Sequence, residues 1–159
     1  MKQITTHFLK LAVIFIGIPV LALCIFFVPK LAFAVSDFLK INSLKYIIYT
    51  ILYGSAIPFY FALYQAFKLL SYIDKNKAFS ELSVIALKKI KYCAISICSI
   101  HVLGLPLFCF VANKDDAPGL VFVGMVIPFA SMVITIFAAV LQRLLQEAIN
   151  IKSENDLTV

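Results

Sequence analysis

Four long runs of apolar residues occur along the chain, and none of them contains Lys, Arg, Asp or Glu. The runs cover residues 11–28, 46–67, 92–111 and 120–141. About 20 apolar residues in helical conformation cross the hydrocarbon core of a bilayer. A surface helix of a soluble domain would carry a continuous polar stripe, and none of the four runs has one. The pattern therefore predicts an all-α integral membrane protein, a four-helix bundle made of two helical hairpins.

The first run also resembles the apolar core of a secretory signal. Lys2 and Lys10 precede it, and residues 32–34 read Ala-Phe-Ala, as a cleavage site would. Such a core is usually only about 7–15 residues long, which is shorter than this run. We therefore expect a retained helix.

Residues 29–45, between the first two runs, mix apolar and charged residues at helical spacing. Leu31, Val35 and Phe38 recur every three or four positions, with Asp37 and Lys40 among them. This pattern is typical of a helix that lies in the membrane interface. We predict that the segment lies at the membrane surface.

The segment between the second and third runs, residues 68–91, predicts a break between two long helices. The second helix should continue to Ile73 and stop at residues 74–77, which read Asp-Lys-Asn-Lys. Ser80 is a suitable N-cap, and Glu81 suits the positive end of a helix that runs into the third span. Residues 142–159 begin as an amphipathic continuation of the fourth helix. We expect these two helical extensions to pack together outside the membrane.

The basic residues lie mainly at one end of the predicted spans. Hydrophobic residues make up 63% of the 159 residues and charged residues 14%, against about 45–50% and about 25% in soluble domains. Ten of the 14 Lys and Arg residues flank the runs at the end that holds both termini. The positive-inside rule therefore predicts cytoplasmic termini, a cytoplasmic loop at 68–91 and a cytoplasmic tail at 142–159, in the inner (plasma) membrane. We expect the net charge of +6 to face anionic lipid, with no direct binding of nucleic acid.

Each apolar run contains one proline, and a proline inside a helix removes a backbone hydrogen bond and bends the helix. The predicted kinks are at Pro19, Pro58, Pro106 and Pro128. A glycine precedes each proline, at two alternating spacings. This regularity is consistent with a parallel repeat of two hairpins and equally with chance in an apolar sequence.

Residues that could carry chemistry inside the membrane are few. His101 is the single ionisable residue near the middle of a run, and no carboxylate or second histidine accompanies it in any run. We expect it to hydrogen-bond to a neighbouring helix. The four cysteines form no C-x-x-C pair and are expected to pack as small apolar residues. Without a phosphate-binding, metal-ligating or nucleophile motif, no cofactor, no metal and no enzyme activity are expected.

Three polar segments carry a resemblance to a known family. They are residues 73–80 (Ile-Asp-Lys-Asn-Lys-Ala-Phe-Ser), 87–91 (Leu-Lys-Lys-Ile-Lys) and 154–159 (Glu-Asn-Asp-Leu-Thr-Val). Together with the order of four spans, they resemble domain-of-unknown-function family 2975, a family of small bacterial membrane proteins. Genes of that family often lie beside a gene for a small helix-turn-helix regulator of the Cro/C1 type. The resemblance therefore implies a regulatory pairing at the cytoplasmic face of the membrane.

These observations favour a non-enzymatic regulatory membrane protein that binds a cytoplasmic partner, with a helix-turn-helix regulator as the candidate. An acidic and apolar tail suits a basic partner with an apolar groove. The predicted partner-binding residues are Asp74, Phe79, Ser80, Glu154, Asn155, Asp156, Leu157, Thr158 and Val159. Two other functions remain open: a small transporter or channel formed by a homo-oligomer, and an immunity protein against a membrane-active peptide.

Overall fold

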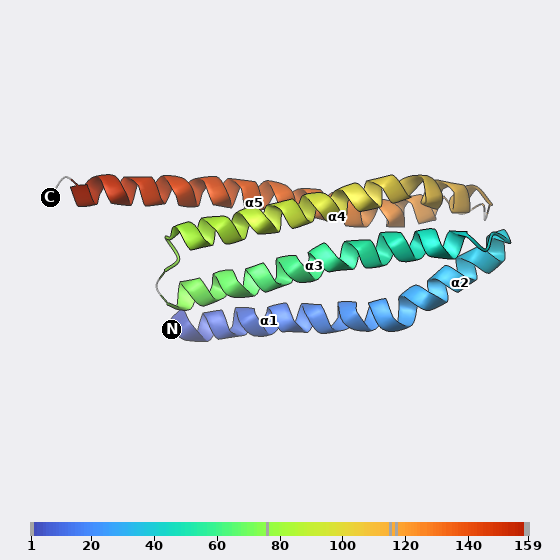
Figure 1. Cartoon of the computed structure of the whole chain (residues 1–159), viewed down its shortest axis with the longest axis horizontal. Coiled ribbons are helices and arrows are strands. Elements are labelled where there is room, and N and C mark those ends of the chain that lie inside the picture. The colour runs from blue at the N-terminus through green and yellow to red at the C-terminus, as the bar shows by residue number, and fades with distance from the viewer. Residues whose placement is uncertain (1, 76, 115, 117, 158–159) are drawn as a thin grey trace.

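The computed structural model describes residues 2–75, 77–114, 116 and 118–157 (Figure 1). The described residues form helices joined by short turns and contain no strand, as predicted. Its elements, in order, are α1 (Lys2–Ala22), the π-helical segment η1 (Leu23–Phe27), α2 (Val28–Leu39), α3 (Leu44–Asp74), α4 (Glu81–Lys114) and α5 (Gly119–Leu157).

Four helical stretches are long and apolar enough to cross a membrane: Thr6–Leu39, Leu44–Asp74, Glu81–Lys114 and Gly119–Asn155. Each contains one of the four predicted spans, so the prediction of four membrane helices is confirmed. The helix break after Ile73 and the unbroken helix from Glu81 are confirmed as well. The helices are longer than the apolar runs because their amphipathic ends continue beyond them.

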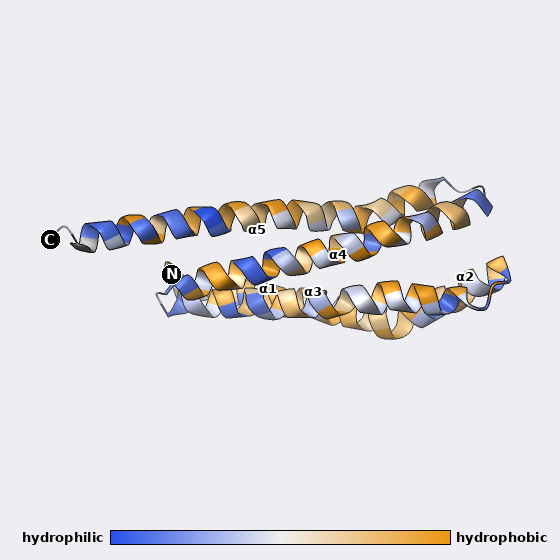
Figure 2. Ribbon diagram, turned by 45° about the horizontal axis from the view of Figure 1, so that its top comes forward, coloured by the Kyte–Doolittle hydropathy of each residue, from blue (hydrophilic) through white to orange (hydrophobic). Residues whose placement is uncertain are grey.

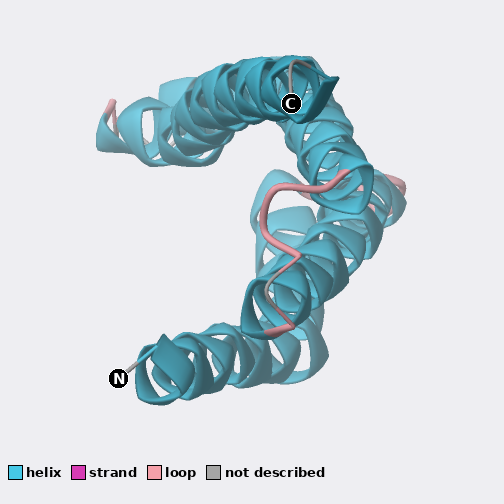
Figure 3. Cartoon of the chain, turned by 90° about the vertical axis from the view of Figure 1, so that its left-hand side faces the viewer, coloured by secondary structure: helices cyan, strands magenta, loops and turns pink. Residues whose placement is uncertain are grey.

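The four long stretches lie side by side in an open, curved row (Figure 3). In this row α4 packs against both α3 and α5, and α1 packs against α3. Among the described residues α1 has no contact with α4 or α5. Large apolar side chains point away from the row; Leu103 is 81% exposed and Phe15 is 76% exposed. Lipid is the solvent that such side chains require, because contact with water would be strongly unfavourable. Both termini lie at the same end of the molecule (Figure 1).

The first span bends sharply at η1 (Figure 1). In this segment the N–H of Val28 bonds to the carbonyl of Leu23, five residues back. The next residue, Pro29, has no N–H, so the Cys24 carbonyl loses its helical donor. The hydroxyl of Tyr53 on α3 donates to that carbonyl at 3.0 Å. The bend is therefore stable within the membrane because a neighbouring helix satisfies the freed carbonyl.

The bend changes the role of residues 29–45. Residues 28–39 do not form a separate helix but continue the first helix beyond the bend as α2, and their position at the membrane surface stays a prediction. Val28, Ala32 and Ser36 of α2 are buried, and the helix contacts α3 and α4. The four predicted kink residues, Pro19, Pro58, Pro106 and Pro128, all lie inside helices.

Candidate functional site

At the end of the molecule that holds both termini, the extensions of α4 and α5 pack against each other. Lys91 Nζ donates to Gln142 Oε1 at 3.0 Å, and Gln146 Nε2 donates to Glu81 Oε1 at 3.1 Å. These polar bonds lie beyond the apolar runs, where water competes and each bond alone adds little. Their position sets the register of the two extensions. The predicted packing of the two extensions is confirmed.

The start of α4 is tied to the loop before it. Ser80 occupies the N-cap position, since its carbonyl accepts the N–H groups of Ser83 and Val84. Its hydroxyl does not act as the usual cap acceptor but donates to the Lys77 carbonyl at 2.7 Å. The fully buried Ser83 donates to the same carbonyl at 3.2 Å. The loop is therefore held against α4, while Phe79 remains 64% exposed.

An ion pair joins α1 to α3 at the same end. Lys10 Nζ donates to Asp74 Oδ2, and both side chains are about four-fifths buried. The Lys10 ammonium also lies 5.7 Å from the centre of the Phe67 ring. Asp74 is the last residue of α3, beyond the apolar run. The hydrogen bond from Lys10 lowers its pKa, burial opposes that shift, and a hydrogen bond from Thr6 adds to it. Asp74, one of the predicted partner-binding residues, is thus engaged within the chain.

The lowered pKa of Asp74 predicts how the stability of the protein depends on pH. A carboxylate with a depressed pKa in the folded state stabilises it above its unfolded pKa, and the contribution is lost as pH falls through the folded value. The difference in thermal midpoint between the wild type and Asp74→Asn should therefore stay constant from neutral pH to about pH 5. It should close only below the ordinary value of 3.8. Circular-dichroism melting curves in detergent at a series of pH values measure this difference. If the two midpoints already coincided near neutral pH, the lowered pKa of Asp74 would be contradicted.

The last part of α5 projects beyond the rest of the molecule (Figure 1). Eleven residues, 147–157, follow the Gln146–Glu81 contact, and at about 1.5 Å per residue they extend about 16 Å. We call this projection the α5 arm; it carries apolar residues in its first half, whereas residues 152–156 are all polar (Figure 2). Ile151 is 60% exposed, and Glu154 and Asn155 are exposed. Of the other predicted residues, Asp156 and Leu157 belong to the last turn of α5, and Thr158 and Val159 lie outside the described residues.

Comparison with known proteins gives the family. The sequence profile of the proteins of unknown function named DUF2975 matches residues 30–159. The chain belongs to the DUF2975 family. It is 63% identical over 160 residues to the uncharacterized membrane protein YoaS of Bacillus subtilis (strain 168), with all of both chains covered. No solved structure matches.

The comparisons agree with the resemblance inferred from the polar segments. This DUF2975 protein is a membrane protein, as its four apolar helices and its Bacillus relative both indicate. The matched range includes the loop before α4 and the whole of α5. The family match therefore covers the loop before α4, all of α5 and three of the four predicted spans, and it leaves out α1.

His101 of this DUF2975 protein lies in the middle of α4 and is buried. Its Nδ1 is 3.0 Å from the carbonyl of Ile97, so Nδ1 carries the proton and donates to its own helix. The predicted bond to a neighbouring helix is wrong for this nitrogen. The other nitrogen, Nε2, is buried without a hydrogen-bond partner among the described residues. In the part of the chain that the structure describes, no three His, Cys, Asp or Glu side chains gather closely enough to hold a metal ion.

Three contacts between helices were not foreseen from the sequence: the Lys10–Asp74 pair, the Tyr53–Cys24 bond and a bond from the Tyr60 hydroxyl to the Gly17 carbonyl at 3.0 Å. All three join α3 to the first span. For the two tyrosine bonds, the sequence did offer a sign: Tyr53 and Tyr60 are seven residues apart, which places both on one face of a helix.

Proposed function

We propose that this protein is a membrane-anchored regulatory protein that holds a cytoplasmic partner on the α5 arm and on the loop before α4, without catalysing a reaction. The observation that supports this function is the α5 arm itself. It extends past its last bond to α4, and it exposes Ile151 beside polar residues. A helix that only spanned the bilayer would need no such extension.

The distribution of basic residues supports a cytoplasmic position for this arm. Ten of the 14 Lys and Arg residues flank the spans at the end that holds the termini, and the positive-inside rule assigns that end to the cytoplasm. The positions of both termini at one end of the molecule are consistent with this orientation (Figure 1).

The partner that suits this arm is a helix-turn-helix regulator of the Cro/C1 type, which the family resemblance implies. Glu154 is exposed near the end of the arm, and a carboxylate there would attract the basic DNA-binding face of such a regulator. Ile151 supplies an apolar anchor one turn earlier. A regulator held on the membrane is unavailable to DNA, so release would follow mass action.

Loss of the arm should remove the partner without disturbing membrane insertion. We expect vesicles that carry the full chain to cosediment with a purified Cro/C1-type regulator from the same organism. A chain in which residues 147–157 are replaced by a Gly/Ser segment of equal length should retain several-fold less of it. The substitution leaves the Gln146–Glu81 and Lys91–Gln142 bonds in place, so α4 and α5 should still pack.

Photocrosslinking supplies a matched control. A photoreactive residue at Ile151 should form an adduct with the regulator, whereas one at Ile134, which is 51% exposed on the same helix within the span, should react with lipid. Equal regulator adducts at both positions, or cosedimentation unchanged by loss of the arm, would contradict the proposed function.

A further inference from the structure

Two hollows adjoin at the end of the molecule opposite the termini. The first has a volume of about 380 Å³ and lies between α2, α3, α4 and the start of α5. Every side chain that lines it is apolar; the walls include Leu31, Val35, Phe38, Ile51, Leu107 and Phe108. Ligand cavities of this size and character bind apolar groups.

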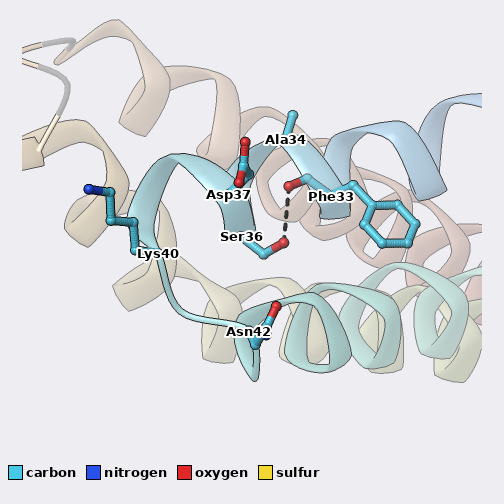
Figure 4. Close-up of a pocket in the computed structure, with 6 residues that line it drawn as sticks. All are labelled: Phe33, Ala34, Ser36, Asp37, Lys40 and Asn42. Atoms are coloured by element: carbon cyan, nitrogen blue, oxygen red, sulfur yellow. Dashed lines mark hydrogen bonds between the residues drawn. The ribbon is translucent and has the colours of Figure 1, made fainter.

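The second hollow is polar and has a volume of about 540 Å³. It lies around the end of α2 and the turn into α3, and its walls are Phe33, Ala34, Ser36, Asp37, Lys40 and Asn42 (Figure 4). Ala34 lines both hollows, so they meet at this residue. Lys45 Nζ lies 5.8 Å from the centre of the Phe33 ring, but Lys45 does not line the polar hollow.

The bend in the first span creates this arrangement. Because η1 turns the chain, α2 contacts both α3 and α4. The apolar stripe of α2 then forms one wall of the apolar hollow, and Asp37 and Lys40 line the polar hollow. π-Helical segments occur frequently at functional sites, and here the segment is what brings α2 over the cavity.

We propose that the two hollows together bind one zwitterionic phospholipid, with an acyl chain in the apolar hollow and the head group in the polar one. Lys40 pairs with the phosphate and Asp37 with the ammonium of a phosphatidylethanolamine-type head group. This site is at the opposite end from the α5 arm, so it does not depend on the proposed partner.

The volume of the apolar hollow suits a flexible acyl chain better than a helix of another protein. An α-helix about 10 Å wide with a pitch of about 5.4 Å displaces about 420 Å³ per turn. The hollow therefore holds less than one turn of a partner helix or of a second copy. The charges at its open end select an amphiphile over a plain hydrocarbon, because Asp37 and Lys40 offer one group of each sign.

The test uses the full-length protein in phosphatidylethanolamine vesicles that contain a trace of the same lipid with a photoreactive group in its acyl chain. After irradiation, peptide mapping should place the adducts mainly on residues 31–38 and 107–111, and excess unlabelled phosphatidylethanolamine should compete. Ala34→Phe fills the junction between the hollows and should lower this labelling by at least about fivefold. Ala130→Phe makes the same change at an exposed position of α5 outside both hollows and should leave it unchanged.

The head group is tested with Asp37→Asn and Lys40→Asn. Asparagine suits position 40 because Lys40 has a left-handed φ of 55°, which asparagine tolerates. Asp37→Asn should lower the preference for phosphatidylethanolamine over phosphatidylglycerol by about two- to fivefold, as for a partly exposed charge pair. Lys40→Asn should weaken the labelling by both lipids without lowering that preference, because both lipids carry the phosphate. Adducts spread evenly along all helices and insensitive to Ala34→Phe would show that lipid merely surrounds the protein. Equal labelling by both lipids in the wild type would overturn the head-group assignment.

Discussion

Replacing Gly124 with alanine should destabilise the protein by about 1–3 kcal/mol, the usual cost of overpacking a tight contact. A Cβ atom at this position would lie 2.8 Å from Cγ of Phe108 and within 3.2 Å of two more ring atoms. Cγ lies at the base of the ring, so the whole side chain of Phe108 must move. Phe108 lies in the most extensive helix contact of the molecule, that of α4 with α5, and also lines the apolar hollow, so a movement of its ring disturbs both.

Gly54 provides a matched control for this change. Both glycines precede a proline by four residues, Pro58 in one case and Pro128 in the other. A Cβ at Gly54 would meet nothing within 4 Å, so Gly54→Ala should stabilise its helix by up to about 1 kcal/mol. Unfolding in detergent, followed by circular dichroism, measures both effects. Shifts of the same sign would contradict the α4–α5 packing, and Phe108→Leu should partly rescue Gly124→Ala.

Removing the hydroxyls of Tyr53 and Tyr60 together should loosen the first span from α3, at a cost of about 1–3 kcal/mol if each membrane hydrogen bond contributes about 0.6–1.7 kcal/mol. These hydroxyls donate to the carbonyls of Cys24 and Gly17 at 3.0 Å each. Before α2, the first span packs on α3 alone among the other long helices, at the edge of the row. We expect Tyr53→Phe to have the larger effect, because Pro29 leaves the Cys24 carbonyl without a helical donor.

The double Phe variant should therefore lower the melting temperature in detergent and speed proteolysis within the first span. Tyr64→Phe is the matched control: Tyr64 lies on the same helix but is 60% exposed, and its substitution should change neither measurement. If Tyr64→Phe lowered the melting temperature as much as Tyr53→Phe, the loss of any tyrosine hydroxyl from α3 would explain the effect. The bond to the Cys24 carbonyl would then not be its cause.

Features with a local cause were predictable from the sequence. Uncharged runs of about 20 residues predicted the four membrane helices because burial of a charge in hydrocarbon is costly. The Asp-Lys-Asn-Lys stretch and Ser80 predicted where α3 ends and α4 begins. Of the candidate partner-binding residues, Phe79, Glu154 and Asn155 are exposed, as binding to a partner requires. Asp74 instead forms an ion pair with Lys10.

The sequence by itself determined that this chain is a set of four lipid-solvated helices with amphipathic ends, because hydropathy and helix signals act over neighbouring residues. Only the tertiary structure decided how the first span bends, which tyrosine satisfies the Cys24 carbonyl and where the two hollows meet at Ala34. The physical reason is that apolar side chains gain about equally from lipid and from one another. Helix arrangement therefore depends on close approach at glycines and on a few polar bonds between residues far apart in the chain, which hydropathy does not encode.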